Sequence, residues 1–332
     1  MKRRVYRLPL AATLSIIAMV VSSAVSSASN GDTRSSGLKN FQHVWVIMME
    51  NTGYSHLIGN SNAPWINSAA ATYGLATNYT GVSHPSQPNY IAATSGSTNG
   101  VADDNDTTID VPNIVDQIEA SGRTWKAYMQ SMSLCATKLD HACGNQLYER
   151  KHNPFVSYAD VQNNPARMAN VVDFSQLSTD LTSGNVPSYS WISPGQCSDM
   201  HGRGGTNPST DRCNFANENY LIQDGDAFLS STVSAIMSSA AWEGNSAIFI
   251  TWDESDFPFN DVSGCCDAVP GGGHVVGLVI SHSSHVARSS SVAYNHYSLL
   301  TTIEQAWLLG CLANTCDVAN VPAMNDLVGP RA

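Results

Sequence analysis

The sequence predicts an α/β protein, a three-layer α/β/α sandwich in which helices cover both faces of a mostly parallel sheet. Two observations lead to this prediction: continuous apolar runs recur along the chain, and helical segments lie between them. Apolar runs without alternation are typical of strands buried on both faces, and their alternation with helices is typical of layered parallel sheets. With 332 residues, 42% of them hydrophobic and 13% charged, the chain can bury a substantial core.

The first 28 residues are predicted to be an export signal. Lys2 and three arginines precede a mostly apolar run over residues 8–21, and small residues at 26–28 resemble a cleavage site. A membrane anchor is the alternative, but Pro9 interrupts the run, which falls short of the ~20 apolar residues that a span needs. We therefore expect a secreted or extracellular protein with no stable membrane insertion. Residues 29–332 would form a single domain, with a flexible N-terminus over 29–40.

Removal of the signal leaves a strongly acidic chain. Of the 16 basic residues, four lie in the signal, so the mature chain has 12 against 27 acidic residues, a formal net charge of −15. Such a charge repels polyanions. We therefore expect no nucleic-acid partner and no docking to strongly anionic membranes.

Eight cysteines, an even number in an exported chain, predict disulfides. A zinc site is the weaker alternative, because the chain has no C-x-x-C pair. Cys265 and Cys266 are adjacent and form either a vicinal pair or bonds to other cysteines. The remaining spacings suggest three short loops, closed by Cys135–Cys143, Cys197–Cys213 and Cys311–Cys316.

The apolar runs that we interpret as buried strands cover residues 43–49 (HVWVIMM), 246–252 (SAIFITW) and 275–280 (VVGLVI). Helices are expected over residues 65–73, 88–94, 114–120, 219–239 and 298–309. Ligands of such sheets gather where parallel strands end on the carboxyl side. Polar residues directly after a strand are therefore the first candidates for chemistry.

Acidic pairs directly follow two of the predicted strands. Glu50 and Asn51 come after the first strand, and Asp253 and Glu254 come after the strand over 246–252. Three carboxylates and an amide make an oxygen-rich site of the kind that holds a hard divalent cation. Helix capping or an exposed strand end is the alternative, and for one such pair it is the more common explanation. Two pairs strengthen the metal interpretation without excluding the other.

Ser86 lies just before a predicted helix, two residues ahead of Pro88, where that helix can begin. Unpaired N–H groups and the helix dipole favour an anion at that position, and phosphate is the obvious candidate. The alternative is that Ser86 only caps the helix, which is the commoner role for a serine there.

Six motifs together resemble the phosphoesterase family that contains secreted bacterial acid phosphatases and phospholipases C, within the alkaline-phosphatase-like superfamily. They extend over nearly the whole mature chain, and they favour a role in chemistry for the residues singled out above. The motifs are IMMEN (47–51), HPSQPNY (84–90), ERKHNPF (149–155), SDMHG (198–202), TWDES (251–255) and NHYSLLTTIEQAWLL (295–309).

The resemblance implies a serine nucleophile and one divalent metal cation of unknown identity. Ser86 would attack phosphorus and form a phosphoseryl intermediate, which water then hydrolyses. A cation at its oxygen would lower the pKa of the hydroxyl and neutralise charge on the incoming phosphate. The residues that would hold the metal are Glu50, Asn51, Asp253, Glu254 and the oxygen of Ser86.

The resemblance also assigns the substrate contacts, to Asn51, Asn89 and His152. Asn89 would donate its side-chain amide to a phosphoryl oxygen, although hydrogen bonding at the helix terminus is its alternative role. His152 and His201 would bind phosphate oxygens or protonate the leaving alkoxide. Asp199 is expected to orient His201, unless the two side chains point to opposite faces of a strand.

Two further histidines, His84 and His296, fall in family motifs, and we consider them weaker candidates for the active site than His152 and His201.

The sequence departs from the family pattern after His201. Residues 203–220, which contain Cys213, form an apparent insertion that would reshape the substrate entrance.

The leading functional prediction is a secreted phosphomonoesterase acting on small-molecule or lipid phosphate esters, including phosphoinositides. A phospholipase C is the alternative within the family, and a catalytically inactive binding protein is the alternative from another class. A serine esterase and a metalloprotease fit poorly, because G-x-S-x-G and H-E-x-x-H are absent. Oligomeric state stays open.

Overall fold

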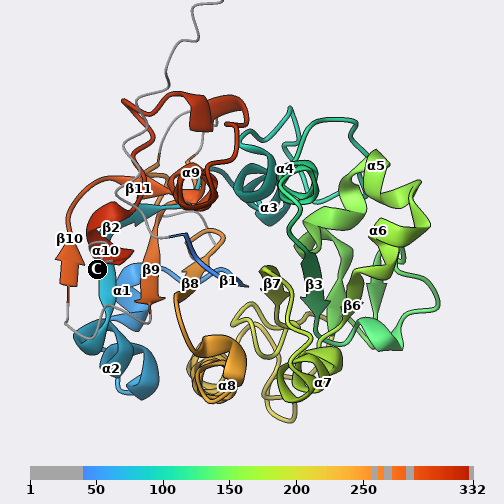
Figure 1. The fold of residues 1–332 in the computed structure, drawn as a ribbon. Coiled ribbons are helices and arrows are strands. Elements are labelled where there is room, and N and C mark those ends of the chain that lie inside the picture. Colours follow the sequence, from blue (N-terminus) through green and yellow to red (C-terminus); the bar gives the residue numbers. More distant parts are fainter. Residues whose placement is uncertain (1–39, 256–260, 265–270, 282–287, 329–332) are drawn as a thin grey trace, which may run out of the picture. The chain divides into compact units, whose positions relative to one another are not determined.

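A nine-stranded sheet with helices on both of its faces dominates the fold (Figure 1). The structure is a computed structural model, and it describes residues 40–255, 261–264, 271–281 and 288–328. The predicted export signal, residues 29–39 and the adjacent Cys265 and Cys266 lie outside the described residues. The described residues all belong to one compact unit.

The strands of the sheet come from the whole length of the described chain. Their spatial order is β10-β2-β9-β8-β1-β7-β3-β6, and β11 also pairs with β2. A separate two-stranded sheet pairs β4 (Ala142–Cys143) with β5 (Tyr148–Glu149). The bounds of the main strands are β1 His43–Met49, β2 Gly74–Thr80, β3 Trp125–Met129, β6 Val171–Asp173, β7 Tyr189–Ser193, β8 Ser246–Trp252, β9 His274–Ser281, β10 Arg288–Ser290 and β11 Tyr294–Asn295.

Helices form the two outer layers. Figure 1 shows α3, α4 and α9 on one face of the sheet and α2, α7 and α8 on the other. The helices are α1 Tyr54–Leu57, α2 Pro64–Thr72, α3 Ser86–Ser95, α4 Ile114–Ala120, α5 Ala159–Gln162, α6 Pro165–Ala169, α7 Ser175–Ser183, α8 Glu218–Met237, α9 His296–Trp307 and α10 Asn325–Val328. Short 3₁₀ segments cover Met132–Leu134, Arg150–His152, Pro154–Ser157, Ala240–Trp242 and Ala313–Cys316.

The predicted fold class and all eight predicted elements are confirmed, with ends that differ by a few residues. Helix α3 starts at Ser86, two residues before its predicted start, because Pro88 fits within a first helical turn. From β8 through β1, β7 and β3 to β6, all neighbouring strands are parallel. Strand β9, on the other side of β8, runs antiparallel to both of its neighbours, β8 and β2. The sheet is therefore mixed but mostly parallel.

Burial explains why these runs form strands. All seven residues of β8 are buried, and so are six of the seven in β1. Helix α3 packs on α9, and α2 packs on α8.

No helix of the described residues is long and apolar enough to cross a membrane. The three disulfides predicted from spacing are present, namely Cys135–Cys143, Cys197–Cys213 and Cys311–Cys316.

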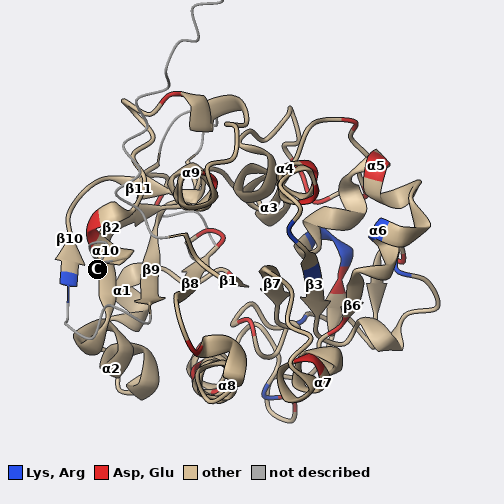
Figure 2. Ribbon diagram, in the orientation of Figure 1, with Lys and Arg blue, Asp and Glu red and all other residues tan. Residues whose placement is uncertain are grey.

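Charged residues of both signs are interspersed over the described chain. Figure 2 shows acidic residues on α4, α5, α7 and α8, and basic residues on β3 and α6. Arg167 of α6 pairs with Glu119 of α4 (Nη2–Oε2, 2.8 Å) and with Asp160 of α5. Its charge therefore helps to join three helices.

The sheet places the ends of several elements together at one edge. Met49 and Trp252 are register partners in the parallel pair β1–β8, so the chain leaves both strands side by side. Strand β7 is the other neighbour of β1 and runs parallel to it. The segment after β7 lies at the same end of the sheet, where the carbonyl oxygen of Asp199 accepts from the backbone N–H of Glu50 at 2.8 Å. Helix α3 follows β2 after a short loop. The residues that follow these strands therefore meet.

Candidate active site

Ser86 lies among carboxylates at the start of α3. Its hydroxyl is 3.0 Å from Glu50 Oε2 and 3.3 Å from Glu254 Oε1, and the side chain is buried. A hydroxyl has one proton, so it donates to one of these oxygens at a time. Pro85 occupies the N-cap position, and Ser86 is the first helical residue. The hydroxyl therefore faces the acidic strand ends and does not cap the helix.

Asn51 joins the two acidic strand ends. Its backbone N–H donates to Asp253 Oδ1 at 3.1 Å, and its side-chain Nδ2 donates to Glu254 Oε1 at 3.2 Å. The backbone of Asn51 has φ +42°, a left-handed conformation that asparagine tolerates better than most residues. Asn51 Oδ1 and Asp253 Oδ2 are buried and accept no hydrogen bond from the described residues. The site thus holds oxygen atoms that still need a partner.

Four buried carboxyl groups give the site an unusual electrostatic character. Burial, and then the charges of Asp253 and Asp199, raise the pKa of Glu50 well above its ordinary value. Burial and the charge of Glu254 do the same to the pKa of Asp253. Burial raises the pKa of Asp199 to about 7. Protons or a bound cation must balance so many acids in a space shielded from water.

His152 and Tyr90 both contact Oε1 of Glu50, the carboxylate oxygen that does not face Ser86. The Tyr90 hydroxyl donates to Glu50 Oε1 at 2.5 Å, and the ring of Tyr90 stacks on His152 with centroids 5.3 Å apart. His152 Nε2 lies 3.2 Å from Glu50 Oε1, and its Nδ1 lies 3.7 Å from Asp199 Oδ2. Both ring nitrogens of His152 therefore face carboxylates. Burial lowers the pKa of His152 well below its ordinary value.

His201 is close to His152, with ring centroids 6.0 Å apart. Its Nδ1 lies 2.6 Å from the carbonyl oxygen of Gly202, which can only accept, so Nδ1 carries the proton and Nε2 is left with a lone pair. Burial lowers the pKa of His201 to about 4. Asp199 Oδ1 accepts from the backbone N–H of His201 at 2.8 Å. The expected orienting contact therefore exists, but it holds the backbone and not the ring.

Asn89 uses its whole side-chain amide on the loop before α3. Its Oδ1 accepts from the N–H groups of Val82 at 2.8 Å and Ser83 at 3.0 Å. Its Nδ2 donates to the carbonyl oxygens of Ser83 at 2.7 Å and Pro85 at 3.2 Å. These contacts match the alternative role of hydrogen bonding at the helix terminus.

The two histidines that ranked second support the acidic strand end after β8. His84 Nδ1 forms a short ion pair with Glu254 Oε2, and this side chain is buried. His296, at the start of α9, approaches the carbonyl oxygen of Asp253 with Nε2 at 2.6 Å and the hydroxyl of Tyr79 with Nδ1 at 3.1 Å. Both contact the acidic strand end after β8.

Three site residues were not found from the sequence: Tyr90, Asp104 and Lys151. Tyr90 is four residues after Ser86, so it lies on the same face of α3, and this spacing was the available signal. Asp104 Oδ1 accepts from the N–H of Gln87 at 2.9 Å, and its Oδ2 accepts from Lys151 Nζ at 2.8 Å. Asp104 and Lys151 meet only through the fold, so no spacing indicates them.

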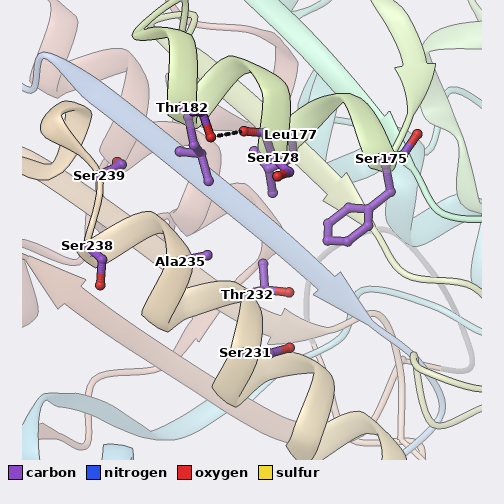
Figure 3. A pocket seen from close by; sticks show the side chains of 11 residues that line it. Ser175, Leu177, Ser178, Thr182, Ser231, Thr232, Ala235, Ser238 and Ser239 are labelled. Carbon is purple, nitrogen blue, oxygen red and sulfur yellow. Dashed lines mark hydrogen bonds between the residues drawn. The ribbon is translucent and has the colours of Figure 1, made fainter.

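A cavity of about 250 Å³ adjoins the site. Its lining includes Lys151 and His201, together with Arg203 and Gly204 from the apparent insertion. A larger cavity of about 430 Å³ lies between α7 and α8 and shares no lining residue with the site. Figure 3 shows its wall of hydroxyl and apolar side chains, with the Thr182 hydroxyl bonded to the Ser178 carbonyl. It has no titratable side chain, so the smaller cavity is the candidate entrance.

Comparison with known proteins gives one family over most of the chain. The family model described as Phosphoesterase family matches residues 60–310. A phosphatidylinositol-3-phosphatase of Mycobacterium tuberculosis is 27% identical over 330 residues, which cover 98% of this chain and 95% of that protein. A probable acid phosphatase of Kluyveromyces lactis is 25% identical over 85% of this chain. The chain spans only 62% of that yeast protein and 58% of an acid phosphatase of Aspergillus fumigatus.

Solved structures share the fold at low sequence identity. A protein of the alkaline phosphatase superfamily from Vibrio parahaemolyticus aligns with a TM-score of 0.57 and 13% identity, over 90% of this chain and 72% of that one. The lipoteichoic acid synthase LtaP from Listeria monocytogenes aligns with a TM-score of 0.57 and 10% identity, over 92% of this chain and 79% of that one. These similarities establish the α/β fold.

Proposed function

The chain belongs to the phosphoesterase family and is a hydrolase of phosphoric esters, and on that premise we propose that it is a phosphomonoesterase with Ser86 as its nucleophile. The observation that carries this proposal is the setting of the Ser86 hydroxyl. It is buried, it does not cap its helix, and it lies within hydrogen-bonding distance of Glu50 and Glu254. A serine hydroxyl is a weak nucleophile unless an adjacent group removes its proton or a cation stabilises its oxygen.

The residues around Ser86 fit a single divalent cation. The residues that would hold it are Glu50, Asn51, Asp253, Glu254 and Ser86, the last through its hydroxyl oxygen. Asn51 Oδ1 and Asp253 Oδ2 are buried and have no hydrogen-bond donor among the described residues. Among the described residues, one group of three possible metal ligands has its ligand atoms within 4.8 Å of one another, namely Cys135, Asp140 and Cys143. The two sulfurs of that group form a disulfide, so it is not a competing metal site. The site carboxylates are more widely spaced. When bound, the cation would lower the pKa of the Ser86 hydroxyl and neutralise phosphoryl charge.

In the first step, the bond from Ser86 Oγ to phosphorus forms while the bond from phosphorus to the ester oxygen breaks. The leaving alkoxide takes up the proton that Ser86 has given to a carboxylate, and the chain keeps a phosphoseryl group. The Ser86 proton has two carboxylate acceptors in the structure, Glu50 Oε2 and Glu254 Oε1. In the second step, water attacks the phosphoserine, Ser86 regains a proton, and inorganic phosphate leaves.

His201 is the proposed base for that water. Its Nδ1 proton is held by the Gly202 carbonyl, so Nε2 is free of a proton and able to accept one. His152 and Tyr90 act as positioning residues, because both contact Glu50. Asn89 is also a positioning residue, since its amide fixes the loop from Val82 to Pro85 that leads into Ser86.

The substrate class that we propose is the phosphate monoester, with phosphoinositides included. The names of the similar proteins support this proposal, since one is a phosphatidylinositol-3-phosphatase and others are acid phosphatases. We also propose that the protein acts outside the cell after removal of residues 1–28. The basic start and apolar run of that segment are the supporting observation.

The test is hydrolysis of p-nitrophenyl phosphate by the purified mature protein and by Ser86→Ala, with and without a chelator. We expect turnover that the substitution abolishes, that the chelator removes, and that one added divalent cation restores. The variant should remain folded, because the Ser86 hydroxyl does not cap its helix and its loss removes only a hydrogen bond to a carboxylate. Absence of turnover with magnesium, calcium, manganese and zinc would refute the proposal. Preference for a phosphodiester substrate would instead identify a phosphodiesterase such as a phospholipase C.

A further inference from the structure

Lys151 is a cation at the edge of a site otherwise rich in acids. It lies in the 3₁₀ segment Arg150–His152, directly before His152, and its side chain is 14% exposed. Its ammonium donates to Asp104 Oδ2 at 2.8 Å, and the other oxygen of Asp104 accepts from the backbone N–H of Gln87, the residue after Ser86. One carboxylate therefore joins Lys151 to the first turn of α3.

The segment that carries Asp104 is fixed over the start of α3. In addition to the bond from its backbone, the side-chain amide of Gln87 lies 3.1 Å from the carbonyl oxygen of Asp103 and 2.8 Å from that of Asn105, and it donates to both once its nitrogen is turned toward them. Gln87 is itself buried. Asp104 is thus held at Gln87 by one carboxylate oxygen while the other oxygen accepts from the Lys151 ammonium.

The charge of Lys151 acts on the whole site. Burial raises the pKa of the carboxyl groups of Glu50, Asp199 and Glu254, and the charge of Lys151 opposes that rise in all three. Burial, and then Lys151, lower the pKa of His152 and of His201. Lys151 and His201 also line the same cavity of about 250 Å³. A group bound in that cavity lies in the field of this ammonium.

We propose that Lys151 determines specificity for monoesters, by binding the phosphoryl oxygen that carries the second negative charge, and that Asp104 is the positioning residue that holds its ammonium. This inference rests on the proposed function of the same site. A phosphate monoester carries up to two negative charges near neutral pH, because its second pKa is about 6, whereas a diester carries one. An ammonium has three N–H donors, so it can contact a phosphoryl oxygen while one donor remains on Asp104.

The experiment compares p-nitrophenyl phosphate with its diester, bis(p-nitrophenyl) phosphate, in the full mature protein supplied with its activating cation. Lys151→Gln should lower kcat/KM for the monoester by on the order of 10²-fold, the usual effect of removing one stabilising donor. It should lower kcat/KM for the diester by less than tenfold. Lys151→Arg keeps the charge and should retain more monoester activity than Lys151→Gln. Lys126→Gln is the matched control, since Lys126 also pairs with an aspartate, Asp180, away from the site.

The role of Asp104 is tested by a double-mutant cycle. Asp104→Asn should lower monoester activity less than Lys151→Gln does, and the double variant should be no less active than Lys151→Gln alone, because Asp104 acts through Lys151. The inhibition constant of inorganic phosphate should rise in Lys151→Gln and stay near the wild-type value in Lys126→Gln. If Lys151→Gln fails to fold, Lys151→Arg and Asp104→Asn still provide the comparison between monoester and diester.

The two proposals fail in different ways. If the wild type hydrolyses neither substrate, the proposed function is wrong. If the wild type is active but Lys151→Gln loses equal factors on monoester and diester, or none on either, the specificity role of Lys151 is wrong while the function stands. Additive losses in the double variant would reject Asp104 as the positioning residue.

Discussion

Asn89, three residues after the proposed nucleophile Ser86, uses its side chain to hydrogen-bond the backbone. Its amide makes four hydrogen bonds to the loop from Val82 to Pro85, and all of its side chain is buried. Asn89→Ala should therefore lower the free energy of unfolding by about 3 kcal/mol, since buried backbone groups lose their partners. Monoester activity should fall with it, because that loop leads into Ser86. Denaturant unfolding and steady-state kinetics on one preparation measure both effects.

Asn320→Ala is the control for that substitution, because Asn320 is exposed and its side-chain Nδ2 donates to Asp317 Oδ2 at 2.8 Å, in an exposed contact. Its effect on unfolding should be below about 1 kcal/mol. Loss of activity in Asn89→Ala with unchanged stability would contradict the positioning role and would favour direct contact with a phosphoryl oxygen.

At the scale of single elements, Asp180 fastens helix α7 to strand β3. It accepts from Lys126 Nζ at 2.5 Å and from the Tyr128 hydroxyl at 2.8 Å, both on β3, and from Gln176 Nε2 at 3.0 Å within α7. Burial alone would raise the pKa of Asp180, but these hydrogen bonds lower it below the ordinary value. The ionised carboxylate therefore stabilises the folded state.

Asp180→Asn should lower the free energy of unfolding by about 2 kcal/mol at pH 7. Because the folded-state pKa is depressed, the contribution is complete above the unfolded-state pKa of about 4 and is lost as the pH falls towards the folded-state value. The difference between wild type and variant should therefore shrink below about pH 4. Urea unfolding between pH 3 and pH 7 measures it. Asp224→Asn, which breaks an exposed ion pair with Arg212, should change stability by less than about 1 kcal/mol.

At the scale of the whole molecule, the Cys197–Cys213 disulfide bridges the Asp199–His201 segment and the apparent insertion that carries Arg203 and Gly204 to the cavity. It closes a loop with a sequence separation of 16. The double variant Cys197→Ala, Cys213→Ala should lose about 3 kcal/mol of stability, whereas the pair Cys311 and Cys316, with a separation of 5, should contribute about 2.

Proteolysis gives the second readout for that double variant. Cleavage within residues 203–220 should be faster than in the wild type. The p-nitrophenyl phosphate activity should fall less than tenfold, because the carboxylates around Ser86 come from other elements and the backbone of His201 keeps its bond to Asp199 Oδ1. A stability loss equal to or below that of the Cys311 and Cys316 variant would contradict the larger contribution of the longer loop.

The sequence was informative where the physical signal is local. Apolar runs such as β1 and β8 identified the strands, and the residues directly after them identified Glu50 and Asp253, because parallel strands deliver their carboxyl ends to one edge. The antiparallel direction of β9 has no local signal, since its apolar run is the same in either direction. Asp104 and Lys151 are likewise brought together by the fold alone. The tautomer of His201 depends on one carbonyl oxygen, that of Gly202, and no sequence pattern specifies it.

The position of β1 has a consequence for folding during synthesis. It is the first strand of the described chain, yet its two neighbours in the sheet, β7 and β8, come much later, with Val44 opposite Tyr189 and His43 opposite Ser246. A ribosome-bound chain that lacks β8 cannot complete the sheet around Glu50, and contacts so distant in sequence make folding slow. Activity should therefore appear only after almost the entire polypeptide has been synthesised, which leaves a long interval in which the chain is still without its fold.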